Sequence, residues 1–475
     1  MKNQFQKYVQ FCLDEGATFA DFRFVEWEEE HIDVHNGYLE DLSHRTDAGV
    51  GVRVLLNGCW GFAATAFLDE KSILNICKEA LKLAEASSSL SHSHIEWTQE
   101  RSHQGFFKTA FEKDPFKVAL HEKVEHLKEV HSKMIKNSKI KLTDSYMIFS
   151  KTNKIYINSE NTSIETSWVQ SGGQISATAV GQNDAQRRTL PENYRKKGYE
   201  WIEEMKFLES AERVSEEAIS LLGAQMCPTK KTNIILDPHQ MALQVHESIG
   251  HPLELDRIFG SEAGYAGRSF VKPEMIGNFI YGSSLVNVTL DSTLPGELGT
   301  VGYDDDGVKA QVVPLIKKGI LVNALTSREY ASKIHKESNA TNIASSWNRM
   351  PIIRMTGIHL EPGDQTLESL ISETEEGIYM KTNKSWSIDD LRQNFQFGCE
   401  IAWEIKNGKL GHMYKNPNYQ GMTPEFWGAC SGIADRSHWE VRGVPNCGKG
   451  EPGQIGRVCH GAAHTKFKNV QVFGT

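Results

Sequence analysis

Residues 233–256 read NIILDPHQMALQVHESIGHPLELD, and this stretch organises the second half of the chain. The apolar run 233–236 is short and rich in β-branched residues, which predicts a buried strand. Asp237 followed by Pro238 is typical of a helix start, because it gives a cap residue and then a proline in the first turn. Pro252 should end or kink that helix. The stretch therefore predicts a strand, a turn and a short helix.

Two histidines flank a glutamate in the second half of this predicted helix, at His246, Glu247 and His251. Imidazoles are good zinc ligands, and an adjacent carboxylate can take a proton from a metal-bound water. The common motif H-E-x-x-H spaces its histidines four apart, whereas these are five apart and would point about 140° apart on a regular helix. Both reach one metal only if the helix widens locally, as in a single-turn π-bulge, and Gly250 tolerates such a distortion cheaply. The alternative is that the histidines lie on opposite sides of an ordinary helix.

Two imidazoles leave a catalytic zinc site incomplete, because such sites usually have three protein ligands. Glu254 and Asp256 follow closely and are candidates, either as ligands or as partners that orient a histidine. A distant cysteine is the other candidate. The sequence pattern by itself leaves these possibilities open.

No two cysteines form a C-x-x-C pair, which argues against a closed structural Cys₄ site. Most have apolar neighbours and are expected to be buried thiols; the set is Cys12, Cys59, Cys77, Cys227, Cys399, Cys430, Cys447 and Cys459. Cys447 differs, since 444–450 reads as a glycine-rich loop, and Lys449 would favour its thiolate. Cys459 with His460 and His464 is a weaker ligand set.

The chain of 475 residues is long enough for two domains, and we expect them at 1–227 and 228–475. Asn-Gly pairs at 36–37 and 57–58 predict two β-hairpins in the first domain. We also expect strands over 143–181, a mobile polar loop over 182–198, and helices over 4–15, 69–86, 114–137 and 209–222.

Many short β-like runs, separated by Gly and Asp, mark the second domain, for example 287–290, 352–355 and 400–405. This spacing suggests a sandwich or a barrel-like sheet. The predicted fold class is α+β, with a strand-rich C-terminal domain that carries a short metal-binding helix. The acidic run 304–306 lacks the other positions of a calcium loop and is expected to form a turn before Gly307.

Composition excludes several classes of function. The net charge is −9 and basic clusters are sparse, so we expect no nucleic-acid partner. The sequence has no apolar stretch of 18 residues and no secretory signal at its start, so we expect no membrane association. Scattered cysteines suit a reducing interior, and the expected location is cytoplasmic.

Several motifs in one order resemble the TldD branch of the TldD/PmbA (TldE) family. The metal motif 246–251, the following Leu-Glu-Leu-Asp at 253–256 and the tail Asn-Cys-Gly-Lys-Gly at 446–450 carry the strongest likeness. The other similar stretches are 49–54, 60–63, 291–296, 303–307, 315–321, 348–351 and 354–356. The resemblance covers nearly the whole chain and is strongest from about residue 230 onward. The segment 457–464 departs from it, because it is richer in histidine and cysteine than the family pattern.

The resemblance implies a cytosolic zinc metallopeptidase with Zn²⁺ bound by His246, His251 and Cys447 and with Glu247 as general base. The family implies peptide substrates that are small or unfolded, because its members enclose the site inside a dimer. We therefore expect either a homodimer or a heterodimer with a TldE-like paralogue. The TldE branch lacks these site residues.

Two other functions remain open from the sequence. The first is a non-catalytic partner or regulator in a TldD/TldE-type complex, which would not need a base beside an open metal site. The second is a zinc hydrolase similar to dipeptidyl peptidase III, whose motif H-E-x-x-G-H takes a downstream glutamate as third ligand. The identity of the third ligand separates the second from the main hypothesis.

Overall fold

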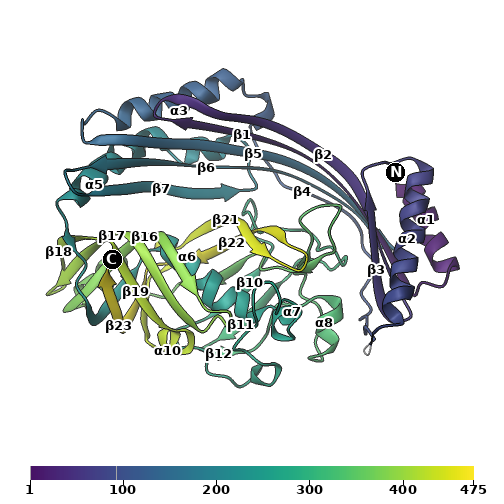
Figure 1. Ribbon diagram of the computed structural model, residues 1–475. Helices are drawn as coiled ribbons and strands as arrows, with labels where there is room; N and C mark the ends of the chain where they lie inside the picture. Colours follow the sequence, from purple (N-terminus) through teal and green to yellow (C-terminus); the bar gives the residue numbers. More distant parts are fainter. Residues whose placement is uncertain (1, 92–93) are drawn as a thin grey trace.

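A long curved sheet from the first half of the chain arches over a strand-rich second half in the computed structural model, which describes residues 2–91 and 94–475 (Figure 1). The strands of this sheet are β1 (Phe19–His35), β2 (Tyr38–Leu56), β3 (Cys59–Thr65), β4 (Gln104–Lys108), β5 (Ile140–Asn158), β6 (Ser163–Val180) and β7 (Ala185–Arg195). The helices that accompany it are α1 (Lys2–Asp14), α2 (Glu70–Ser88), α3 (Leu120–Met134), α4 (Glu200–Glu204), α5 (Phe207–Leu222) and the 3₁₀ turn η1 (Pro115–Lys117).

Both predicted hairpins are confirmed. The first turn joins β1 to β2 through Asn36 and Gly37, whose φ angles are 49° and 80°. The second joins β2 to β3 through Asn57 and Gly58, with φ angles of 51° and 74°. Positive φ at both central residues is the type I′ geometry that matches the twist of paired strands, and asparagine and glycine adopt it at low cost.

The sheet runs in the order β3-β2-β1-β5-β6, and β4 and β7 both pair with β6. Helices α1 and α2 pack on one end of it through a core that includes Phe5, Cys12 and Cys77. Helices α3 and α5 pack on the other end around Leu127 and Phe149. Figure 1 shows α3 on the side away from the second half, so the opposite face of the sheet is turned toward that half.

The prediction of a mobile loop over 182–198 is wrong, because Ala185–Arg195 forms strand β7 along β6. The charged residues that suggested a loop have partners from distant elements. Arg188 is buried and forms ion pairs with Glu217, at 2.8 Å, and with Glu400, at 2.5 Å. Glu400 belongs to the second half, so β7 is fixed to both halves of the chain.

A closed five-stranded barrel lies at the centre of the second half, in the order β16-β9-β23-β19-β17 with β17 pairing back to β16. The barrel-like expectation is therefore confirmed. These strands are β9 (Lys230–Leu236), β16 (Glu376–Ile388), β17 (Asn394–Lys406), β19 (Pro417–Met422) and β23 (Thr465–Gly474). On β17 exposed and buried side chains alternate at Asn394–Phe397, so Phe395 and Phe397 join the core. The strands β8 (Gln225–Met226), β18 (Lys409–Lys415) and β20 (Cys430–Ile433) extend this sheet.

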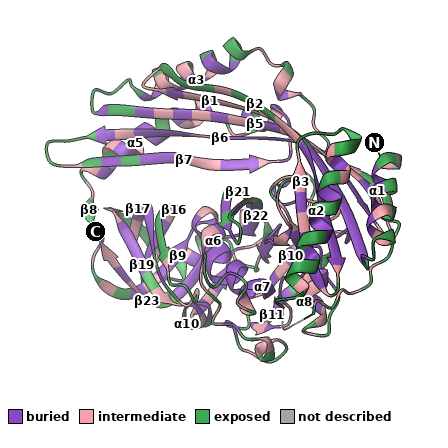
Figure 2. Ribbon diagram, turned by 45° about the vertical axis from the view of Figure 1, so that its right-hand side comes forward, coloured by how far each residue is buried: buried purple, intermediate pink, exposed green. Residues whose placement is uncertain are grey.

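The remaining elements surround the helix that follows β9. The helices are α6 (Pro238–Val245), α7 (Leu255–Ile258), α8 (Arg328–Ser332), α9 (Leu367–Ser372), α10 (Thr423–Gly428), a π-helix η2 (His246–Gly250) and the 3₁₀ turns η3 (His251–Leu253), η4 (Pro273–Met275) and η5 (Arg436–His438). The strands are β10 (Val288–Asp291), β11 (Val312–Lys317), β12 (Ile320–Leu321), β13 (Asn342–Ile343), β14 (Ile352–Ile353), β15 (Ile358–Leu360), β21 (Glu440–Lys449) and β22 (Gln454–Ala462). Helix α6 is mostly buried beside the two-stranded ribbon β21–β22 (Figure 2).

Buried ion pairs join the two halves at the predicted turn 304–306, which is confirmed by a bond from the Gly307 amide to the Asp304 carbonyl. Asp305 lies 2.6 Å from Lys154, and Asp306 lies 2.9 Å from Arg53. The division of the chain at 227–228 stays a prediction. Among the described residues, no helix combines the length and the apolar character needed to cross a membrane.

Candidate metal centre

The helix after β9 begins and widens as its sequence predicts. Asp237 caps it, since its carboxylate accepts a hydrogen bond of 2.9 Å from the Gln240 amide. Residues His246–Gly250 form a π-helix, in which the His251 amide donates to the His246 carbonyl five residues back. This geometry brings the two histidine rings to a centroid separation of 4.9 Å. The predicted π-bulge is confirmed.

The reason for a glycine at 250 differs from the expected one. Its φ and ψ of −58° and −66° are in the helical region, which residues other than glycine also adopt without strain. A Cβ at this position would lie 2.0 Å from the sulfur of Met355. A larger residue at 250 would therefore force the Met355 side chain to move, so the close approach of Met355, and not backbone freedom, favours glycine here.

His246, His251 and Cys447 come together in one buried cluster. One ligand atom from each lies within 4.8 Å of the others, although Cys447 is almost 200 residues away in sequence. The Cys447 Sγ is 3.7 Å from His251 Nε2. Tetrahedral zinc with ordinary bond lengths would separate a sulfur and a nitrogen ligand by about 3.6 Å, so the pair fits a shared metal.

The hydrogen bonds of His246 determine which of its nitrogens is free. His460 Nδ1 lies 3.0 Å from the Ile358 carbonyl, and burial lowers the pKa of His460 to about 3, so this ring is neutral and donates from Nδ1. Its Nε2 therefore accepts, and the partner at 2.8 Å is His246 Nδ1, which must carry the proton. The Nε2 lone pair of His246 is left for a metal.

His251 is oriented in the same way by a carboxylate. Its Nδ1 lies 2.8 Å from Glu254 Oε2, which makes Nδ1 the protonated nitrogen and leaves the Nε2 lone pair facing Cys447. Burial lowers the pKa of His251 well below its usual value, as it does for His246. Glu254 is thus a partner that orients a histidine, one of the two roles the sequence left open.

Cys447 lies on β21 rather than in the predicted loop over 444–450. Strand β21 pairs with β22, with an irregular register between Val444 and Cys447, and the glycines that suggested a loop sit within this ribbon. Burial raises the pKa of the Cys447 thiol to about 12, an effect that Arg354 opposes. Forming the thiolate in this place requires a strong compensating cation, which a metal ion would supply.

A network of buried charges lies behind the cluster. Lys449 Nζ is 2.7 Å from Asp256 and 3.0 Å from Glu262, so it does not serve the Cys447 thiol as the sequence suggested. Arg257 binds Glu262 at 2.8 Å. Glu254 belongs to the same network, at 3.4 Å from Lys449 and 3.6 Å from Arg257, so each of the three carboxylates behind the cluster has a cationic partner.

Glu247 lies beside the metal ligands but is held by a residue that the sequence did not single out. Its Oε2 accepts a hydrogen bond of 2.5 Å from Arg392 Nη1. Burial raises the pKa of the Glu247 carboxyl, and Arg392 opposes that shift. Arg392 sits in the turn between β16 and β17 with a φ of 62°. Nothing in its local sequence indicates a contact with a residue 145 positions away.

Arg354 is the second functional neighbour that sequence reasoning missed, although its segment carried part of the family resemblance. It donates from Nη2 to the carbonyl of Cys447. Cys459, an expected weaker ligand, is buried elsewhere and is absent from the described ligand cluster, while His460 supports His246. The donor set of two imidazoles and one thiolate is typical of zinc.

Comparison with known proteins agrees with this site. The PmbA/TldA metallopeptidase C-terminal domain matches residues 229–474, and domain 1 and the central domain of the same family match 20–84 and 113–222. A metalloprotease of Methanocaldococcus jannaschii is 29% identical, over 86% of this chain and 88% of its own. A zinc metalloprotease TldD homolog of Saccharolobus solfataricus is 24% identical, over 98% of this chain and 99% of its own.

Solved structures have the same fold. The crystal structure of TldE from Thermococcus kodakarensis superposes with a TM-score of 0.77 at 15% identity, covering 99% of this chain and all of the other. The family match covers more than half of the chain and includes the whole His-His-Cys cluster. This chain therefore belongs to the PmbA/TldD metallopeptidase family and is a metalloprotease.

Proposed function

We propose that this metalloprotease is zinc-dependent and hydrolyses small or unfolded peptides, with Glu247 as its general base. The observation that carries the proposal is the His246, His251 and Cys447 cluster with a buried carboxylate directly beside it. A relative of similar length is described as a zinc metalloprotease. The same donor set supports zinc as the metal.

In this proposal the ligands and the base have separate tasks. A zinc ion held by His246, His251 and Cys447 would polarise the scissile carbonyl and lower the pKa of its bound water. Glu247 takes a proton from the attacking water and returns it to the leaving amine. Burial raises the pKa of Glu247, which favours the protonated form that must later give its proton to the leaving amine.

Arg392 has a place in the same scheme. One of its amino groups binds Glu247, while its Nε has no hydrogen-bond partner among the described residues although it is buried. A guanidinium has five donors, so Arg392 can hold Glu247 and also donate to a carbonyl oxygen that becomes negative. We infer that it orients the base and stabilises the oxyanion.

The proposals on substrate size and on dimer formation concern how a substrate reaches the buried metal ligands. All three metal ligands are less than 5% exposed, so only an extended segment can reach them. We propose a dimer, formed with a second copy or with a TldE-like chain, whose cavity excludes folded proteins. Light scattering should give the mass of two chains at micromolar concentration, and a monomer that digests tightly folded proteins would rule this out. The segment 182–198 is part of the sheet and has no gating role.

Digestion of an unfolded protein tests the activity. The chain should cleave casein, lose activity with a chelator and recover it with zinc. Glu247→Gln removes the base while retaining the shape, so turnover should fall by about 10² or more while zinc stays bound. Glu274→Gln, an exposed glutamate on η4, is the matched control and should leave turnover unchanged.

The same experiment separates the alternative function. A non-catalytic partner would bind zinc and yet show no chelator-sensitive cleavage, alone or with a TldE-like chain. Wild-type turnover in the Glu247→Gln chain would remove this glutamate from the mechanism.

A further inference from the structure

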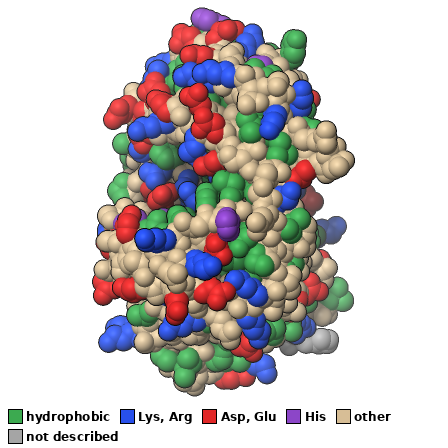
Figure 3. Space-filling view, turned by 90° about the vertical axis from the view of Figure 1, so that its left-hand side faces the viewer, with side chains coloured by type: hydrophobic (Ala, Val, Ile, Leu, Met, Phe, Trp, Pro, Cys, Tyr) green, Lys and Arg blue, Asp and Glu red, His purple; other side chains and the backbone are tan. Residues whose placement is uncertain are grey.

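A cavity of about 470 Å³ lies between the curved sheet and the second half, and its lining does not include His246, His251 or Cys447. Strands β1, β5 and β6 form one wall, and β22 with the segments around 300 and 345 forms the other. Figure 3 shows a recess with apolar side chains between the upper and lower parts of the molecule, on a face where acidic and basic groups are mixed. Nothing in the proposed peptidase chemistry uses this space.

Lys196, just after β7, is the unusual member of the lining. It is 6% exposed, and its Nζ donates to the Thr300 carbonyl and lies 4.8 Å from the centre of the Trp168 ring. It forms no ion pair within the described residues. Charged side chains almost never remain buried without a partner of opposite sign.

The side chains that line the cavity carry more positive than negative charge. The described lining residues include four cations, Lys154, Lys196, Arg354 and Arg457, but Glu29 alone among acids. Lys154 is neutralised by Asp305 and Arg457 by Glu29, at 2.6 and 2.9 Å. Lys196 is left over, whereas Arg354, with two guanidinium nitrogens that have no hydrogen-bond partner among the described residues, also lies beside the Cys447 thiol of the metal centre. Lys196 is therefore a cation of the lining that has no anionic partner among the described residues.

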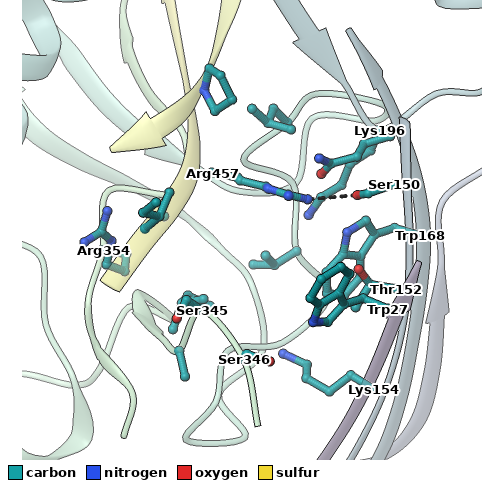
Figure 4. Close-up of a pocket in the computed structure, with 18 of the residues that line it drawn as sticks. Trp27, Ser150, Thr152, Lys154, Trp168, Lys196, Ser345, Ser346, Arg354 and Arg457 are labelled. Atoms are coloured by element: carbon teal, nitrogen blue, oxygen red, sulfur yellow. Dashed lines mark hydrogen bonds between the residues drawn. The ribbon is translucent and has the colours of Figure 1, made fainter. Parts of the chain in front are cut away.

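The walls favour a particular kind of anion. Figure 4 shows Trp27 and Trp168 on the sheet wall near Lys154 and Lys196, with Arg457 reaching across to Ser150. Gln170, also in the lining and 2% exposed, has a side-chain oxygen without a partner. Two aromatic faces beside an ammonium group suit a flat or apolar body that ends in a charged head.

We propose that this cavity is a binding site for an organic carboxylate, whose anionic head pairs with Lys196 and whose apolar body packs on Trp168. The carboxylate belongs either to a free small acid or to the C-terminus of a peptide. The cavity also borders Asn446, the neighbour of Cys447, so an occupant would lie next to the strand that carries a metal ligand. The site is separate from the zinc ligands and does not depend on the proposed catalysis.

Paired ligands that differ only in charge test the proposal on the full-length chain. Phenylacetate is compared with phenylacetamide, and N-acetyl-Gly-Phe with its amide, by calorimetry and by quenching of tryptophan fluorescence. The peptide pair uses the Glu247→Gln chain so that hydrolysis does not consume it. A carboxylate should bind at least about tenfold more tightly than its amide, a difference of about 1.4 kcal/mol. If phenylacetate binds more tightly than N-acetyl-Gly-Phe, the ligand is a free small acid. If the peptide binds more tightly, the ligand is the C-terminus of a peptide.

Substitutions locate the binding. Lys196→Met should weaken carboxylate binding at least about tenfold, while Lys197→Met, which removes a more exposed lysine paired with Glu204, should leave it unchanged. Trp168→Phe should reduce the fluorescence response.

Burial together with Lys154 lowers the pKa of Lys196 to about 7. Binding at pH 8 should therefore take up a proton in the wild type and none in Lys196→Met.

Three results would overturn the proposal. They are equal binding of carboxylates and amides, unchanged affinity in Lys196→Met, and no binding of either carboxylate to the wild-type chain. Lys196→Met removes a buried charge without a counterion, so it should fold at least as stably as the wild type. If it unfolds, the wild-type comparison of carboxylates with amides, together with the Trp168→Phe chain, still decides the question.

Discussion

Two buried lysines, Lys449 and Lys196, lie in opposite electrostatic surroundings. Lys449, behind the metal centre, has Asp256 at 2.7 Å, Glu262 at 3.0 Å and Glu254 at 3.4 Å. Lys196, in the cavity, has a carbonyl and an aromatic ring as contacts, and Lys154 and Arg457 disfavour its charge. A buried lysine with its counterions inside the chain keeps its charge as part of the structure, whereas burial without them lowers the pKa of Lys196 and makes it a candidate site for an external anion.

Bound zinc is the property that should differ most between a cysteine variant of the metal centre and one near the cavity. Cys447→Ala removes a ligand from the metal centre and should reduce bound zinc from about one per chain to nearly none, because two imidazoles hold the metal poorly. Cys459→Ala, near Lys196, should keep the zinc, since Cys459 lies outside the ligand cluster. Metal analysis after dialysis measures both. Loss of zinc from Cys459→Ala but not from Cys447→Ala would show that Cys459, and not Cys447, is the third metal ligand.

The next largest difference is expected in the free energy of unfolding of two variants, one at each lysine. Lys449→Met leaves three carboxylates buried with one cation, and breaking such a buried network should lower the free energy of unfolding by about 3–5 kcal/mol. Lys196→Met should cost nothing. Urea unfolding of both variants checks this. Equal destabilisation would mean that Lys196 also has a structural partner.

The supports of the two histidines should matter less than the ligands. Glu254→Gln keeps the contact with His251 but removes the charge that fixes the ring, so metal affinity should fall by about 10–100-fold. Gln170→Glu, in the cavity, should leave metal affinity unchanged and weaken carboxylate binding through repulsion. Competition with a chromophoric chelator measures the first effect, and calorimetry the second. An unchanged metal affinity in Glu254→Gln would reduce Glu254 to a packing role.

The dependence of stability on pH should also report the buried position of Lys196. Burial, with Lys154, lowers its pKa in the folded chain to about 7, so above that pH the unfolded chain binds more protons than the folded one. The free energy of unfolding should therefore rise with pH from about 7 toward 10, by at most about 1.4 kcal/mol per pH unit. Below about pH 7 both states are protonated and this contribution is constant. The rise should be absent from Lys196→Met, and its persistence there would assign it to another group.

The same contrast explains what the sequence predicted and what it missed. The helix start at Asp237, the π-bulge and the hairpin turns depend on residues close in sequence, and all three are confirmed. Strand β7 was missed because the partners of Arg188 come from α5 and β17. Arg392 was missed because only the folded barrel brings its turn to Glu247. Local patterns determine turns and caps, whereas the compensation of buried charges depends on contacts that no local pattern contains.

The metal ion is expected to lie between His246, His251 and Cys447. An anomalous-difference map of a zinc-loaded crystal, recorded on both sides of the zinc edge, tests it most directly. We expect one strong peak per chain, bonded to the Nε2 atoms of both histidines and to the sulfur of Cys447, with Glu254 hydrogen-bonded to His251 and outside the ligand set. A peak bonded to Glu254 or Cys459, or a peak that leaves Cys447 free, would contradict it.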